Sequence, residues 1–293
     1  MSTNIDNIIA INDGTNTAGA IALWSLSGDI DRAELVAAWG EESDDLPELV
    51  RPLRALRRAV QEQAGQRRRL VRPIRNGFAL VDEHEADADL DYRVAAKATL
   101  EGAYVHVTTA VDGLEEALRS AYRRHLGVLD ANDVSCWLVR EMDGVDAVGL
   151  RERGGVYFIP PAGLPRVERI AKALEVCSRH RVYRIPAMRT EEAVEAVLAA
   201  VGAEATAAIN SLQDDLNQQR YSTPRGWAGR TRDLDALEGK IARYEGLLGR
   251  KLEWLGSHLA SVRAGIAAAS LACADGEDNG GLGDLAAFGG LAL

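Results

Sequence analysis

Cysteine is scarce in this sequence, and long hydrophobic runs are missing from it. The three cysteines among its 293 residues are Cys136, Cys177 and Cys273. An odd number at such wide spacing excludes a disulfide framework and favours a reducing compartment, so we expect a cytoplasmic protein. The longest apolar stretch, Leu255 to Ala274, is interrupted by His258 and Arg263 and is not a clean span of about 20 apolar positions. We therefore expect no membrane anchor.

Complete catalytic and metal-binding motifs are missing as well. Gly154-Gly155 lacks the following Lys-Ser or Lys-Thr that a phosphate-binding loop requires. Cys177 and His180 have the spacing of half a zinc site, but structural zinc needs four ligands. We expect no cofactor, no metal and no catalytic residue. An enzyme or small-molecule binder stays an alternative, because a site assembled from distant segments leaves no motif.

Positive charge is in deficit overall but concentrated in one place. The 34 Lys and Arg against 44 Asp and Glu give a net charge of −10, which excludes a surface that attracts polyanions everywhere. Residues 51–75, the basic block, nevertheless hold nine arginines and a single acid, Glu62. This block is the best candidate for a binding surface.

Three interpretations of the basic block stay open: contacts with nucleic acid, neutralisation within the molecule, and contacts with a protein partner. A helix, a second helix and an Asn-Gly hairpin loosely resemble a winged helix-turn-helix without its third helix, which implies arginine contacts with nucleic-acid phosphates. Alternatively, the acidic flanks 29–48 and 82–91 neutralise the block within the molecule. The candidate nucleic-acid contacts are Arg54, Arg58, Arg68, Arg69 and Arg72.

The first two thirds of the chain predict an α+β head with antiparallel strands. Asn76-Gly77 favours a tight type I′ turn in a hairpin, which two more strands extend to a four-stranded meander. Pro47 opens a helix, and Asn132 or Asp133 can cap another. The remaining predicted helices are 31–39, 114–126 and one that begins near Pro165, and the remaining predicted strands are 147–151, 156–160 and 181–185. Residues 21–26 are an apolar segment that ends at a turn and cap signal before the first of these helices.

The C-terminal third predicts two long helices. Apolar positions recur at alternating spacings of three and four, and Pro224 separates a run of roughly 30 residues from one of roughly 45. Such arms reach about 45 and 68 Å, too long for a small head to cover. We therefore expect a coiled-coil-like antiparallel hairpin through which copies associate, in a non-enzymatic assembly protein that forms a homo-oligomer. The predicted seam residues are Leu198, Val201, Leu212, Leu237, Ile241, Leu248 and Leu255.

The patterns divide the chain into four segments. These are an N-terminal helical segment (1–65), the α+β head (66–188), the helical hairpin (189–273) and an acidic, Gly-rich tail expected to be disordered (274–293). At the hairpin tip, four arginines between positions 220 and 232 interleave with Tyr221 and Trp227. These aromatics could stack on bases, or Trp227 could clamp the turn between the helices.

Overall fold

A computed structural model describes residues 16–67, 69–86, 89–152 and 155–280 of the chain. The chain is 57% helix and 22% strand with antiparallel sheets, which confirms the predicted α+β class. It divides into two compact units, and each is discontinuous in sequence. Unit 1 comprises residues 1–23, 142–164 and 183–293, and unit 2 comprises residues 24–141 and 165–182.

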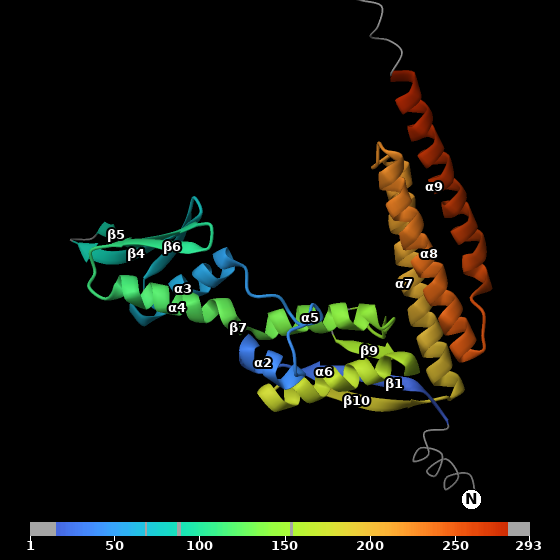
Figure 1. Ribbon diagram of the computed structural model, residues 1–293, viewed down its shortest axis with the longest axis horizontal. Coiled ribbons are helices and arrows are strands. Elements are labelled where there is room, and N and C mark those ends of the chain that lie inside the picture. The colour runs from blue at the N-terminus through green and yellow to red at the C-terminus, as the bar shows by residue number, and fades with distance from the viewer. Residues whose placement is uncertain (1–15, 68, 87–88, 153–154, 281–293) are drawn as a thin grey trace, which may run out of the picture. The chain divides into compact units, whose positions relative to one another are not determined.

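Unit 2 contains the predicted meander (Figure 1). Its four strands lie in the order β3-β4-β5-β6, with antiparallel neighbours, and two helices pack on them. The strands are β3 (Leu70–Ile74), β4 (Gly77–Ala86), β5 (Asp89–Glu101) and β6 (Tyr104–Thr109), and the helices are α3 (Pro52–Arg67) and α4 (Leu114–Gly127). Helix α3 begins at Pro52 and not at the expected Pro47, since residues 47–51 are irregular.

The turn between β3 and β4 differs from the expected type I′ turn. Arg75 and Asn76 connect the strands, and Asn76 has a φ of 56° whereas Gly77 has no positive φ. Gly77 serves another purpose, because a Cβ atom there would lie 2.1 Å from the carbonyl oxygen of Ala98 on the neighbouring strand. The Asn-Gly dipeptide thus marks the hairpin because Asn76 adopts a positive φ and Gly77 permits the close approach of the neighbouring strand.

The rest of unit 2 closes its core. Ile30, Leu56, Leu118, Trp137 and Leu174 are buried together, each at most 1% exposed. The elements that supply these residues and their neighbours are β2 (Ile30–Asp31), α2 (Arg32–Trp39), β7 (Val128–Leu129), α5 (Ala131–Gly144) and α6 (Leu164–Cys177). The last three residues of α5 and the first residue of α6 belong to unit 1.

Unit 1 holds the second sheet. Its strands lie in the order β10-β1-β9-β8, with β9 antiparallel to both β1 and β8. Pro186 lies in β10, an edge strand, which is where proline is tolerated in a sheet. The strands are β1 (Thr17–Ser25), β8 (Val148–Gly149), β9 (Val156–Ile159) and β10 (Arg181–Met188).

Three long helices, not two, follow the second sheet. The expected 45-residue helix is two helices, because Gly249 takes a left-handed φ of 71° and its N–H caps the carbonyl oxygen of Glu245. Helix α9 therefore packs against both others. A coiled-coil hairpin is not confirmed. The helices are α7 (Glu191–Asn217), α8 (Pro224–Leu248) and α9 (Glu253–Gly280).

All seven predicted seam residues lie in the core of unit 1. Leu255 is 1% exposed and Val201 3%, and Leu237 is partly buried against the same core. The third helix thus covers the apolar stripe that the sequence left without an intrachain partner. Part of the expected tail, through Gly280, is helical, while residues 281–293 lie outside the described part of the chain. Among the described helices, none has the length and apolar character needed to cross a membrane.

Candidate nucleic-acid interface

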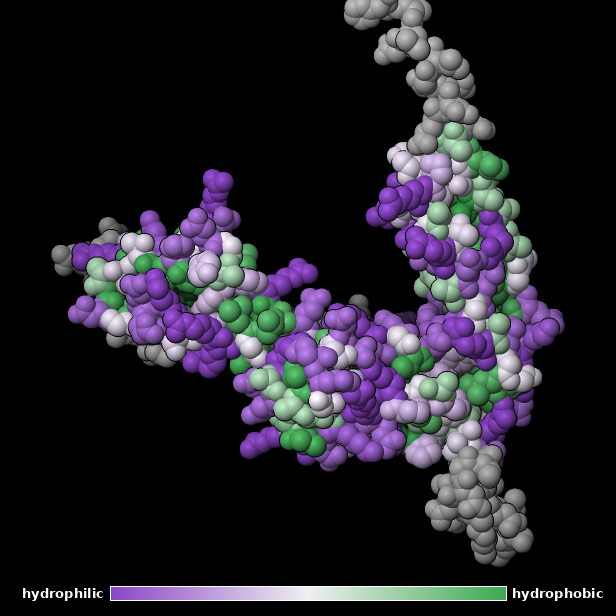
Figure 2. All heavy atoms as spheres, viewed as in Figure 1, coloured by the Kyte–Doolittle hydropathy of each residue, from purple (hydrophilic) through white to green (hydrophobic). Residues whose placement is uncertain are grey.

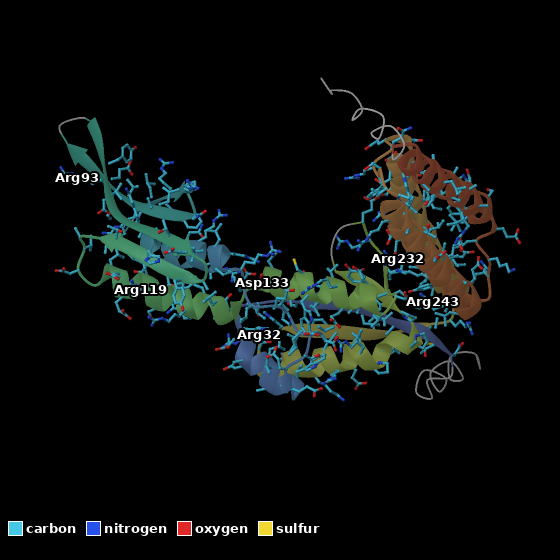
Figure 3. The ribbon with its side chains drawn as sticks, turned by 45° about the horizontal axis from the view of Figure 1, so that its top comes forward. Arg32, Arg93, Arg119, Asp133, Arg232 and Arg243 are labelled. Atoms are coloured by element: carbon cyan, nitrogen blue, oxygen red, sulfur yellow. The ribbon has the colours of Figure 1, made fainter. Side chains whose placement is uncertain are left out.

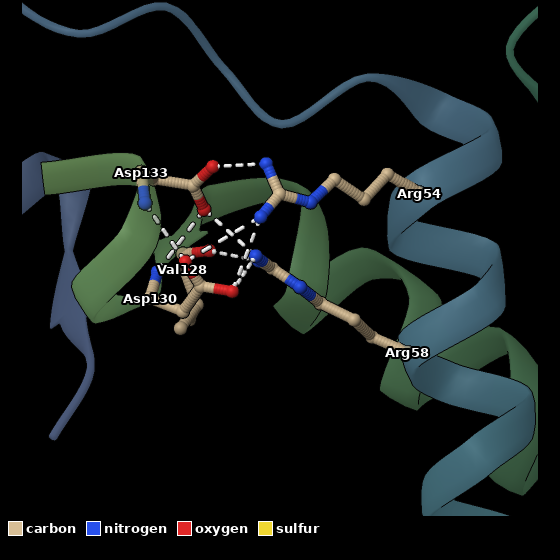
Figure 4. A network of polar contacts seen from close by, with 5 residues as sticks. All are labelled: Arg54, Arg58, Val128, Asp130 and Asp133. Carbon is tan, nitrogen blue, oxygen red and sulfur yellow. Dashed lines mark hydrogen bonds and ion pairs between the residues drawn. The ribbon is translucent and has the colours of Figure 1, made fainter. Parts of the chain in front are cut away.

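Two of the candidate arginines meet a pair of carboxylates at the start of α5 (Figure 4). Asp130 accepts a hydrogen bond from the backbone N–H of Asp133 at 2.8 Å, and Asp133 accepts one from Asp130 at 3.1 Å. This reciprocal arrangement caps the helix at Asp130, which lies two residues before Asn132 and three before Asp133, the N-cap positions expected from the sequence. Arg54 and Arg58, one turn apart on α3, both bond to both carboxylates, with Arg58 Nη2 at 2.7 Å from Asp133 Oδ2.

The network favours the ionised form of Asp130. Burial acts against the charge of Asp130, but the backbone N–H of Asp133 and the guanidinium of Arg58 together hold the pKa of Asp130 below its ordinary value. Arg58 also donates to the carbonyl oxygen of Val128 at 3.0 Å. Because both arginines are neutralised by neighbours within the molecule, they join α3 to α5 and present little free charge. Asp130 and Asp133 lie outside the two acidic flanks, residues 29–48 and 82–91, that the sequence suggested as partners of the basic block.

The other three candidates are dispersed. Arg69 is buried under α3, with its side chain 4% exposed and its Nε 2.5 Å from Oδ1 of Asp82. That pair fits the expected neutralisation by the second acidic flank. Arg68 lies outside the described residues. Arg72 is exposed on β3 and has no ion pair with any described residue.

Arg72 belongs to a row of polar side chains across the sheet. Strand register places Arg72 opposite Ala79, Ala79 opposite Lys97, and Lys97 opposite Thr108. Directly opposed residues share a face, and α3 and α4 pack on the other face, against Leu80 and its neighbours. We call the face of Arg72 and Lys97 the open face. Both cations are exposed on it, about 10 Å apart over the small side chain of Ala79.

Aromatic and titratable side chains flank this row. Tyr104 on β6 is 79% exposed, and Tyr92 on β5 is 50% exposed. His106 contacts Glu101 at 3.0 Å, and Arg75 in the adjoining turn is exposed. In Figure 2 the visible surface of this part of unit 2 mixes hydrophilic and hydrophobic side chains. The open face therefore combines cations and planar rings with carboxylates, because Glu101 lies opposite Tyr104 and Glu83 lies opposite Tyr92, whose hydroxyl donates to Glu83 at 3.4 Å.

Lys97 and Tyr104 were missed at the sequence level, although a signal was present. Apolar residues at 96, 98 and 100 point to the core, so Lys97 must point away from it. Val94 departs from this alternation, because the extra residue Ala95 forms a bulge that turns Val94 to the open face, where it is 55% exposed.

The other arginines near the helices of unit 2 differ in their charged neighbours. Arg119 of α4 (Figure 3) pairs with Glu115 one turn earlier at 2.8 Å. Arg51 and Arg140 are exposed and line a groove of about 380 Å³ beside the capping network, together with Glu48 and Asp133. This groove carries charges of both signs. Among the described side chains, no group of three His, Cys, Asp or Glu residues is placed to hold a metal ion.

Comparison with known proteins gives one relationship. No curated protein and no solved structure matches the chain. A model of a family of unknown function, DUF6744, matches residues 18–275, which include the described strands except Thr17 of β1 and the three long helices except the last residues of α9. The chain therefore belongs to this family, DUF6744.

Proposed function

We propose that this protein binds single-stranded nucleic acid through the open face of the β3-β4-β5-β6 sheet. The observation that carries the proposal is the row formed by Arg72 and Lys97, two exposed cations on one face without a carboxylate partner among the described residues. Phosphates of a nucleic-acid strand would supply the missing negative charge. The proposal narrows the predicted role of residues 51–75 to the hairpin, since Arg54, Arg58 and Arg69 already have partners.

The aromatic side chains favour a single strand over a duplex. Tyr92 and Tyr104 are exposed on or beside this face, and base stacking on such rings requires bases that are not enclosed in a helix. A sheet with rings and cations also fits the general way in which proteins recognise unpaired bases. The net charge of −10 predicts weak binding at physiological salt, confined to this one surface.

The test compares two charge reversals in the full chain. Binding of a labelled oligothymidine of about 20 nucleotides is followed by fluorescence anisotropy at about 50 mM salt. Arg72→Glu with Lys97→Glu should weaken binding by about tenfold or more and flatten its salt dependence. The control, Arg57→Glu with Arg123→Glu, changes the net charge equally but on exposed positions of α3 and α4. No binding by the unaltered protein, or equal losses in both variants, would overturn the proposal.

Self-association stays a separate prediction. The apolar stripe of the long helices no longer supports self-association, because the seven seam residues are covered within one chain. Oligomerisation would have to use other surfaces, and the mass in solution tests it directly.

A further inference from the structure

Strand β6 is an open edge of the β3-β4-β5-β6 sheet. No backbone hydrogen bond joins it to a described residue outside that sheet. The other three edges of the two four-stranded sheets carry features that hinder pairing, since β3 contains Pro73, β10 contains Pro186 and β8 has only two residues. Strand β6 has six residues and no proline, lysine, arginine or carboxylate. It is therefore the edge best suited to accept another strand.

The ladder identifies the backbone groups of β6 that face outward. Leu100 of β5 donates its N–H to the carbonyl oxygen of Asn76 at 2.8 Å, on the side of β5 that is away from β6. Leu100 lies opposite Val105, and opposed residues of an antiparallel pair either bond to one another or both turn away. The N–H and C=O of Val105 therefore point out of the sheet, and alternation along the continuous register gives Val107 the same direction.

A hollow of about 260 Å³ lies between this edge and α4, which packs beside β6 (Figure 1). Its walls are Ala103, Tyr104 and Val105 at the edge, and Arg119, Tyr122, Arg123 and Leu126 of α4. Arg123 is exposed and has no ion pair with the described residues, whereas Arg119 shares its charge with Glu115. The walls thus supply two guanidinium groups and no carboxylate, which favours a negatively charged ligand.

A strand added to β6 would bring alternate side chains to this hollow. Val105 and Val107 are partly buried against the core, so their side chains lie on the face on which α3 and α4 pack. In an added antiparallel strand, the residue opposite Val105 points to the same face. A glutamate there can lay its methylene groups on Val105 and Leu126 and bring its carboxylate to the guanidinium of Arg123.

We propose that the edge of β6 binds an extended peptide, which adds a strand antiparallel to β6 and places a glutamate side chain in the hollow beside α4. Such recognition combines backbone hydrogen bonds with a pocket that selects a side chain. The antiparallel direction is that of every pair in this sheet. The charge of the hollow favours an acidic peptide over a second copy of β6, which has no carboxylate. Arg72 and Lys97 take no part, so the proposal is independent of nucleic-acid binding.

Two matched peptides test the glutamate. The probe is fluorescein-Thr-Thr-Val-Glu-Val-Thr-Thr-amide, its control has Gln in place of Glu, and fluorescence anisotropy with the full chain measures both affinities. The Glu peptide should bind about three- to tenfold more tightly. Arg123→Gln should reduce this preference to less than about twofold, whereas Arg57→Gln, an equal loss of charge at an exposed position of α3, should preserve it. Equal affinities of the two peptides for the unaltered protein would overturn the proposal.

Methylation of single peptide nitrogens tests the strand pairing. Opposite Val105, the N–H of the peptide's Glu should bond to the carbonyl oxygen of Val105, whereas the N–H of the following valine points away from β6. N-methylation at Glu should therefore weaken binding by about tenfold or more, and N-methylation at that valine by less than about twofold. Equal losses would contradict an added strand.

Hydrogen exchange of the ¹⁵N-labelled full chain locates the peptide. The amides of Val105 and Val107 should exchange more slowly once the Glu peptide is bound, and His106, whose N–H faces β5, is the internal reference. Slow exchange before any peptide is added would show an edge already covered, by a second copy if the mass exceeds 31.6 kDa, and would overturn the proposal. Displacement of the peptide by oligothymidine from the Arg72→Glu, Lys97→Glu variant would assign the hollow to phosphate groups and overturn it as well.

Discussion

The imidazole of His180 accepts a hydrogen bond at Nδ1 from the backbone N–H of Ser27, 153 positions away in the sequence, at 3.0 Å. The side chain is fully buried, and its Nε2 atom has no hydrogen-bond partner among the described residues. Burial lowers the pKa of His180, and nearby Asp29 acts in the opposite direction to a smaller extent. The ring is therefore neutral in the folded protein.

This arrangement predicts a loss of stability in mild acid. As the pH falls below about 6.5, His180 takes up a proton in the unfolded chain before it does so in the folded one. The free energy of unfolding then decreases with falling pH by at most about 1.4 kcal/mol per pH unit for this group, until the folded pKa is also passed. Urea denaturation between about pH 7.5 and 5.5 measures the slope.

The matched variant is His180→Asn, whose side-chain oxygen can accept from Ser27 but does not titrate. The other four histidines are unchanged, so the difference between the two slopes reports His180. Identical slopes would contradict the assignment of a buried neutral ring.

Removal of Arg58 should destabilise the chain more than removal of its neighbour Arg57. Arg58→Met leaves Asp130 and Asp133 with one guanidinium in place of two, and we expect the free energy of unfolding to fall by about 1–3 kcal/mol, since the pair is only partly buried. Arg57 is exposed and has no ion pair with the described residues, so Arg57→Met should change stability by less than about 0.5 kcal/mol. A double-mutant cycle with Asp133→Asn isolates the interaction, and additivity of the two changes would argue against it.

Leu255→Ala distinguishes a core residue from an oligomer contact. The side chain is 1% exposed within one chain, so truncation should lower the free energy of unfolding by about 2–5 kcal/mol. Leu271, 66% exposed on the same helix, is the control and should have a small effect when changed to Ala. Light scattering during size exclusion gives the mass relative to 31.6 kDa. A change of mass in Leu255→Ala would mean that this residue faces a second copy.

The sequence predicted those elements whose signals are local. Alternation and the Asn-Gly dipeptide located the meander, and three-and-four spacing located the long helices. The break between α8 and α9 was harder to place, because Gly239, Gly246, Gly249 and Gly256 look alike in sequence. Of these, only Gly249 takes the left-handed conformation, and the difference depends on the packing of α9 against the other helices.

The partners of the basic block depended on tertiary structure. Charge counting along the chain pointed to the nearest acidic runs, but Asp133 lies 75 positions after Arg58. The N-terminus of α5 brings the two carboxylates together, and no local sequence pattern indicates that this N-terminus lies beside α3. The open face was within reach of the sequence, because the residue that follows each inward apolar position along a strand must point outward.

The interleaving of the two units sets the order in which they can be completed during translation. Ala20 of β1 pairs with Ile159 of β9, so the first strand leaves the ribosome long before its partner has been made. All of unit 2 has been synthesised once residue 182 emerges, whereas unit 1 still lacks its three long helices. Unit 2 can therefore fold first, and β1 stays without its hydrogen-bond partners until the later strands have been synthesised. A gene for unit 2 alone would need residues 141 and 165 joined by a linker, because no single truncation isolates it.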